Sequence, residues 1–246
     1  MILDRTTGFY TSLTTELRRR SSRAVTNYLS PLSPSLREFL RTQLDQAPGI
    51  TGSLLADPVF EATFGWREHG ETMHELSGAL LHPSLVHAMD VAETERFNCS
   101  WRPYAHQVEA WQLLREEPAR SVVVSSGTGS GKTECFLVPI LDSLARQRAA
   151  GGDLVGIQAL FLYPLNALIN SQRDRLRSWT AAFGEDVRFC LYNGNTPHTD
   201  PPRHEAQRAP QEVMGRPQLR KQPPPILITN STMLEYMLVR REDAPI

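Results

Sequence analysis

The stretch that decides the fold begins at residue 125 and reads Ser125-Ser126-Gly127-Thr128-Gly129-Ser130-Gly131-Lys132-Thr133-Glu134. Three valines at residues 122–124 come before it, and an apolar stretch at residues 136–144 follows it. A strand, a glycine-rich turn ending in Gly-Lys-Thr and then a helix are typical of a phosphate-binding loop. The glycines let backbone N–H groups face a phosphate, and the helix N-terminus adds a partial positive charge. The sequence therefore predicts a nucleoside triphosphate site here.

Lys132 has the most specific expected role in this stretch. Of the 26 basic residues in the chain, only Lys132 and Lys221 are lysines, so a lysine inside the loop stands out from an arginine background. We expect Lys132 to bind the β- and γ-phosphates and Thr133 to ligate Mg²⁺. Ser126 replaces the small glycine or alanine that usually opens this motif, which changes a turn position and no phosphate donor. A plain Gly/Ser surface turn is disfavoured because strand, loop, Lys-Thr and helix all agree.

Length and composition indicate a globular chain. The 246 residues, 40% hydrophobic and 22% charged, suit one large domain or two small ones. The net charge of −1 gives no global basic signal for nucleic acid, although a groove with local positive charge remains compatible with it. Cys99, Cys135 and Cys190 have no metal-binding spacing and suggest reduced thiols. Because no apolar run approaches the roughly 18 residues of a membrane span, we expect a cytoplasmic protein without a membrane partner.

From about residue 100 the pattern alternates between strands and helices. Strands are expected at 122–124, 157–163, 187–192 and 226–229, and helices at 132–148, 166–182 and from 233 onward. Such alternation predicts an α/β fold with a parallel sheet covered by helices on both faces. Before it, helical spacing at 14–29 and 36–44 predicts a mostly helical accessory region. We therefore expect a division into residues 1–79 and residues 80–246.

Residues 193–225 form a long proline-rich insert between the last two expected strands. Its middle, 203–214, could be helical, whereas its flanks carry too many prolines for regular structure. A solvated loop is the simplest interpretation. Its basic residues could alternatively contact a phosphate backbone.

The segment before the phosphate loop contains Arg102-Pro103-Tyr104-Ala105-His106-Gln107. A glutamine amide offers an acceptor and two donors, which complement the N6/N7 edge of adenine. Arg102 and Tyr104 offer flat surfaces for stacking on a base. Three later segments each follow the carboxyl end of a predicted strand. They present small polar groups or a helix N-terminus, which suit contacts to nucleic-acid phosphates. They are Tyr163-Pro164-Leu165-Asn166-Ala167-Leu168, Tyr192-Asn193-Gly194-Asn195-Thr196-Pro197 and Ile228-Thr229-Asn230-Ser231-Thr232-Met233-Leu234.

In order and spacing, these segments resemble the motifs of the first RecA-like domain of superfamily 2 DEAD/DEAH-box helicases. The amino-acid sequences of these motifs are most similar to those of bacterial DNA-repair and phage-defence helicases. The resemblance covers roughly residues 80–246. It implies an ATP and Mg²⁺ site in which Gln107 binds adenine and Lys132 and Thr133 are the catalytic residues, with Thr133 on the metal. The cofactor-binding set would be Arg102, Tyr104, Gln107, Ser126, Gly127, Thr128, Gly129, Ser130, Gly131, Lys132, Thr133 and Glu134. The resemblance also implies a nucleic-acid strand, DNA rather than RNA, along Pro164, Asn166, Gly194, Thr229 and Asn230.

The family's motif II, an apolar strand ending in an acidic pair, has no counterpart after Lys132, and no second RecA-like domain follows. Because the acidic pair helps to hold Mg²⁺ and orients the attacking water, we expect the chain alone to hydrolyse no ATP at a useful rate. It would require motif II and the second domain, in cis or from a partner. An incomplete sheet would also leave strand edges unpaired, so we expect an insoluble or partner-dependent fragment.

Three functions remain open from the sequence. The leading hypothesis is the N-terminal part of an ATP-dependent helicase or translocase, in which nucleotide binding closes two domains on a strand. The absence of motif II supports a second hypothesis, a non-catalytic module that binds a nucleotide or nucleic acid. A small-molecule kinase with the same phosphate loop is disfavoured by the Gln107 segment and by residues 229–234.

Overall fold

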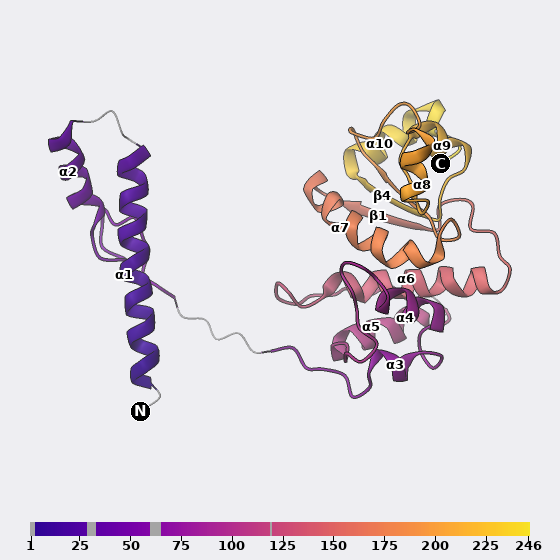
Figure 1. Cartoon of the computed structure of the whole chain (residues 1–246), viewed down its shortest axis with the longest axis horizontal. Helices are drawn as coiled ribbons and strands as arrows, with labels where there is room; N and C mark the ends of the chain where they lie inside the picture. The colour runs from indigo at the N-terminus through magenta and orange to yellow at the C-terminus, as the bar shows by residue number, and fades with distance from the viewer. Residues whose placement is uncertain (1–2, 29–32, 60–64, 119) are drawn as a thin grey trace. The chain divides into compact units, whose positions relative to one another are not determined.

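A computed structural model describes residues 3–28, 33–59, 65–118 and 120–246. The chain forms two compact units, Met1–Phe64 and Gly65–Ile246 (Figure 1). Residues 65–79 belong to the second unit, where Met73 and Leu76 pack in its main core. The domain limit that we expect near residue 79 is a limit of family resemblance, and it stays a prediction.

The first unit is a pair of helices, α1 (Leu3–Tyr28) and α2 (Pro34–Leu44). Helix α2 begins where the side chain of Ser33 accepts a hydrogen bond from the backbone N–H of Leu36, with a proline in the first turn. An ion pair of 3.1 Å between Arg18 and Asp45 also lies within this unit. The expected helical character of this region is thus observed, and its first helix begins well before residue 14.

The second unit contains a four-stranded sheet whose described strands are all parallel. The strands are β1 (Ala159–Tyr163), β2 (Phe189–Tyr192), β3 (Glu212–Val213) and β4 (Ile226–Asn230), in the order β1-β4-β2-β3. Pairing of Tyr163 with Asn230 and of Tyr192 with Thr229 brings three carboxyl ends to one edge of the sheet. Ligand sites of parallel sheets lie at that edge.

Helices cover both faces of this sheet, as the alternation of strand side chains shows. Phe189, Ile226 and Ile228 pack into the main core with α6 (Lys132–Ala149) and α7 (Asn166–Thr180). Cys190 and Leu227, which alternate with them, pack into a second core with α9 (Arg216–Lys221) and α10 (Ser231–Val239). This arrangement, visible in Figure 1, confirms the predicted α/β class with helices on both faces.

The remaining elements of the second unit are short, apart from one helix that positions the site. That helix, α5 (Ala105–Arg115), packs along α6 through Val108 and Trp111. The short elements are α3 (Met73–Leu76), α4 (Pro83–Asp90), α8 (Arg203–Arg208) and two 3₁₀ turns, η1 (Ala181–Phe183) and η2 (Arg241–Asp243). In the described ranges, no helix has the length and apolar character to cross a membrane.

The predicted strand at residues 122–124 is wrong. These residues pair with no described strand, and Val123 is 93% exposed. Three β-branched residues favour extended backbone, but a strand also needs a neighbour to bond with. β1 is the outer strand at one edge of the sheet, and no described segment pairs with its outer side. Its Leu160 and Leu162 are half exposed.

The insert at residues 193–225 has more structure than its prolines suggest. Its middle forms α8 and then the two-residue strand β3, which pairs with β2. The expectation of irregular flanks is wrong at α9, where Pro217 sits in the first helical turn. A proline is tolerated there because the first-turn N–H groups of a helix have no partner within the helix.

Candidate nucleotide-binding site

The glycine-rich loop is shaped by two glycines in the left-handed region. Gly129 has φ +79° and Gly131 has φ +71°, and Gly131 is the residue that caps the N-terminus of α6. A side chain at Gly131 would be strained there, and its Cβ would lie 2.2 Å from Nε2 of Gln107. The loop therefore leads directly into the N-terminus of α6, a geometry that favours binding of an anion.

Lys132 turns back over this loop. Its Nζ donates hydrogen bonds to the carbonyl oxygens of Ser126, at 2.9 Å, and Gly127, at 2.7 Å. The ammonium group is thus held against the start of the loop, and Thr133 follows Lys132 in the first turn of α6. The structure places both expected catalytic residues at one helix end.

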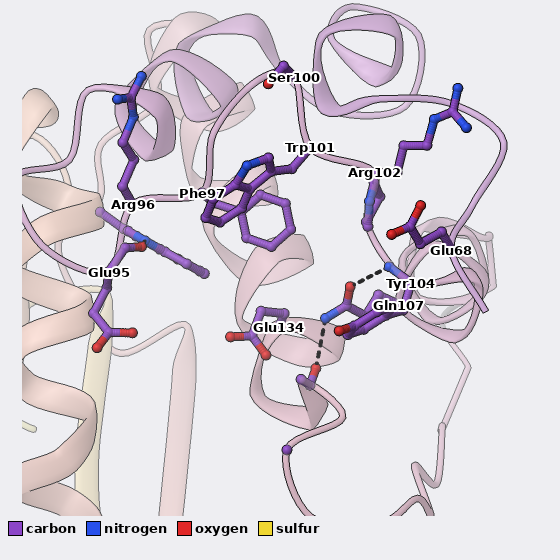
Figure 2. Close-up of a pocket in the computed structure, with 14 residues that line it drawn as sticks. Glu68, Glu95, Arg96, Phe97, Ser100, Trp101, Arg102, Tyr104, Gln107 and Glu134 are labelled. Atoms are coloured by element: carbon purple, nitrogen blue, oxygen red, sulfur yellow. Dashed lines mark hydrogen bonds between the residues drawn. The ribbon is translucent and has the colours of Figure 1, made fainter. Parts of the chain in front are cut away.

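Gln107 is buried, with 2% of its surface exposed, and its amide joins two parts of the site. Its Oε1 accepts a hydrogen bond from the Tyr104 backbone N–H at 2.8 Å, and its Nε2 donates to the carbonyl oxygen of Gly131 at 3.1 Å (Figure 2). An amide has two N–H groups and two lone pairs on oxygen. One donor and one acceptor of Gln107 therefore remain for a ligand.

A cavity of about 660 Å³ lies between the Gln107 segment and the start of α6. This volume is within the usual range for small-molecule sites. Arg102 and Tyr104 line it as expected, but the Arg102 side chain points away from its centre, while Phe97 and Trp101 lie across it (Figure 2). We did not predict that Trp101 would line the cavity, although it directly precedes Arg102 in the sequence. The aromatic side chains that line the cavity are Phe97, Trp101, Tyr104 and Trp179.

A charged bridge crosses from α7 to the start of α6. Arg175 contacts Glu134 at 2.9 Å and Glu95 at 3.0 Å, and its guanidinium carbon lies 5.7 Å from the ring centroid of Trp179. The indole N–H of Trp179 donates to the carbonyl oxygen of Glu95 at 2.8 Å. These contacts join residues that are far apart in the sequence, so no local pattern predicts them.

Three aromatic residues, Trp66, Tyr104 and His106, pack together next to the glycine-rich loop. Trp66 lies beside Gly127, where an added Cβ would come within 3.2 Å of its ring, and contacts His106 edge to face. A ring nitrogen of His106 bonds the carbonyl oxygen of Ser130 at 2.8 Å, and Tyr104 stacks on the His106 ring. The Tyr104 ring, which we expected to stack on a base, is thus already stacked on a neighbour.

The expected nucleic-acid residues gather only in part. Asn230 donates from its side-chain amide to Oδ1 of Asn166 at 2.8 Å, next to the exposed Pro164. Gly194 is exposed after β2. Thr229 is fully buried, and its hydroxyl donates to the carbonyl oxygen of Tyr192. This burial speaks against a side-chain contact between Thr229 and a strand of nucleic acid.

The described residues fit Mg²⁺ only as a companion of the nucleotide. The ligand that we expect from the chain is the hydroxyl of Thr133, in the first turn of α6, and the described ranges contain no cluster of three or more acidic, histidine or cysteine side chains that could hold a metal. Mg²⁺ is commonly held by one or two protein ligands together with the phosphates of its substrate. Phosphate oxygens and water would complete the coordination of the metal here.

The three cysteines differ in how readily they should react. Burial raises the pKa of Cys135, which follows Glu134 in α6, to about 11, and burial also raises the pKa of Cys190. A hydrogen bond with Asp90 raises the pKa of the partly exposed Cys99. A raised pKa lowers the thiolate fraction at a given pH, so reactivity should increase with pH.

We therefore expect iodoacetamide at pH 8 to label native protein slowly and at Cys99 only, with a rate that increases towards pH 10. Peptide mapping by mass spectrometry would locate the label, and denatured protein, in which all three cysteines should react, is the control. Rapid native labelling of Cys135 would contradict the buried environment at the start of α6.

Three curated relatives are similar in sequence to part of this chain. The protein DruE of Escherichia coli is 40% identical over 123 residues, which are 44% of this chain and 6% of DruE. The uncharacterized ATP-dependent helicase YprA of Bacillus subtilis is 32% identical over 93 residues, 38% of this chain and 11% of YprA. The ATP-dependent RNA helicase dbp9 of Schizosaccharomyces pombe is 32% identical over 119 residues, 48% of this chain and 19% of dbp9. The chain thus spans less than a fifth of each of these relatives.

No solved structure matches the chain. The family model described as DEAD/DEAH box helicase matches residues 104–244, which include Gln107, the glycine-rich loop and all three strand-end segments. This match covers more than half of the sequence and agrees with the parallel sheet and with the loop at the start of α6. The chain therefore belongs to the DEAD/DEAH box helicase family.

Proposed function

We propose that the chain binds ATP in the cavity beside α6 and forms part of the motor domain of an ATP-dependent helicase or translocase. The observation that carries this proposal is the bond between Gln107 and Gly131. It joins the side chain suited to adenine to the residue that caps the phosphate-binding helix. A single ligand with a base at one end and phosphates at the other matches that arrangement.

Each part of the site would do a separate task. The N–H groups of the loop and the N-terminus of α6 would bind phosphate oxygens, and Lys132 would move from two carbonyl oxygens to the β- and γ-phosphates. Gln107 would use its remaining donor and acceptor on the adenine edge. Mg²⁺ bound with ATP supplies positive charge to the phosphates, and Thr133 would hold it in place.

The strand ends would hold a nucleic-acid strand. Pro164 and Gly194 lie exposed after β1 and β2. Asn230 is the partly exposed last residue of β4, and Asn166 is the first residue of α7. Helix N-termini and amide side chains there suit phosphate and sugar contacts, which position a strand without selecting its sequence. The preference for DNA over RNA stays a prediction.

We also propose that these 246 residues bind ATP without turning it over. In residues 133–246 no apolar segment ends in an acidic pair of the motif II kind, so the groups that orient the attacking water would come from motif II and a second RecA-like domain, in cis or from a partner.

Calorimetric titration of the full chain with ATP and Mg²⁺ tests the proposal. We expect saturable binding with a dissociation constant on the order of 1 μM to 1 mM, the range of typical Michaelis constants. Phosphate release should stay at background, and anisotropy of labelled DNA and RNA of equal sequence would compare the two strands. Folded protein that binds no ATP would overturn the proposed function, and robust phosphate release would overturn the predicted inactivity.

A further inference from the structure

One carboxylate oxygen of Glu134 has no partner. Its Oε1 contacts Arg175 at 2.9 Å, whereas its Oε2 is buried and accepts no hydrogen bond from any described residue. Glu134 is 9% exposed and lines the 660 Å³ cavity. A buried charged oxygen without a donor is costly, so its position points to a ligand that supplies one.

This oxygen lies close to the amide of Gln107. A Cβ placed on Gly131 would be 3.0 Å from Oε2 of Glu134 and 2.2 Å from Nε2 of Gln107, so both atoms border the same small space. Figure 2 shows the two side chains on the same wall of the cavity, Gln107 with its two bonds to the backbone. A ligand group that reaches Gln107 therefore comes within reach of Glu134 as well.

We propose that Glu134 selects adenine by accepting a hydrogen bond from the N6 amine of the base. This inference rests on the proposed function, because it requires ATP in the cavity. The amine carries two N–H groups, of which Gln107 would accept one and Glu134 the other. Hypoxanthine and guanine carry a carbonyl oxygen at the same position, which would face the lone pairs of the carboxylate. The pair would thus favour 6-amino purines over 6-oxo purines.

Arg175 acts as the positioning residue for this carboxylate. It holds Oε1 of Glu134 and is itself fixed by Glu95 and by the ring of Trp179. Because Arg175 belongs to α7, the orientation of the base-contacting oxygen depends on a helix that begins at one of the strand-end segments.

Calorimetry with ATP and with ITP, each with Mg²⁺, tests the inference on the full chain. In the wild type we expect ATP to bind about 10- to 100-fold more tightly than ITP, the effect of one hydrogen bond to a charged group. In Glu134→Gln the ratio should fall by about tenfold, because the amide can turn its N–H towards the carbonyl of ITP. Glu109→Gln, an exposed glutamate on α5, is the matched control and should keep the wild-type ratio.

Two further measurements separate the alternatives. Arg175→Ala leaves Glu134 in the chain but removes its support, and we expect the ATP:ITP ratio to fall there too. An unchanged ratio in a Glu134→Gln protein that still binds ATP would overturn the inference and leave the proposed function standing. Weaker binding of 2′-deoxy-ATP in the wild type only would assign Glu134 to the ribose and would also overturn it. A folded wild type that binds no ATP would overturn both proposals.

Discussion

Lys132→Ala should lower the affinity for ATP by roughly 100-fold or more. In the proposed complex the ammonium makes charge-assisted hydrogen bonds to two phosphates, each contributing about 1.5–3 kcal/mol, and 1.4 kcal/mol corresponds to a factor of ten. Without a ligand, the same ammonium binds only two carbonyl oxygens of the loop. The change should therefore affect binding much more than folding. Calorimetry with ATP and Mg²⁺ measures the loss.

The chain provides a matched control for this experiment. Lys221 is the only other lysine in the sequence, is exposed and lies at the end of α9 in the insert. Lys221→Ala removes an equal charge and should bind ATP as the wild type does. Lys132→Arg should still bind weakly, because a planar guanidinium does not replace a compact ammonium in a curved loop. Binding by Lys132→Ala equal to that of the control would mean that the loop does not hold the phosphates.

Trp111→Ala should cause the largest loss of stability that we expect from one substitution. The Trp111 side chain is fully buried between α5 and α6, and its indole N–H donates to the carbonyl oxygen of Glu134 at 2.8 Å. Removing such a side chain costs about 3–5 kcal/mol, and for a domain of this size that lowers the melting temperature by roughly 6–20 °C. Thermal unfolding followed by circular dichroism measures the shift.

A conservative variant separates volume from hydrogen bonding. Trp111→Phe keeps most of the apolar contact but loses the indole N–H and some side-chain volume. We expect the lost hydrogen bond to cost about 1 kcal/mol, in addition to the cost of the smaller volume. Leu238→Ala, at a position that is 78% exposed on α10, should melt within about 2 °C of the wild type. A melting temperature of Trp111→Ala equal to that of Leu238→Ala would show that α5 is not packed on α6 as described.

The parts of the molecule that the sequence predicts are those with local causes. Glycines at positive φ and alternating apolar segments each act within a few residues, so the turn of the glycine-rich loop before α6 and the parallel sheet were predictable. The burial of Thr229 was not, because it depends on how β4 sits between two neighbours. The same reason explains residues 122–124, where an extended propensity meets no partner strand in the described part of the chain.

The site shows the same division. The roles of Gln107 and Lys132 were predicted from short motifs and stay predictions. The Arg175–Glu134 contact and the choice of Trp101 over Arg102 as the surface facing the cavity depend on packing between α5, α6 and α7. A pair of opposite charges far apart in sequence gives no signal in one chain, since many other pairings fit the same composition.

The two sides of the sheet differ, and this difference limits how copies of the chain can associate. At one edge of the sheet lies β3, whose two residues are buried. At the other edge lies β1, whose five residues pair with β4 on one side and with no described segment on the other. In the described part of the chain, the backbone open to strand pairing with a second copy is therefore that of β1. If two β1 strands paired antiparallel about a two-fold axis, neither would keep an unpaired edge, so association through this strand would end at a symmetric dimer and would not continue into a fibre.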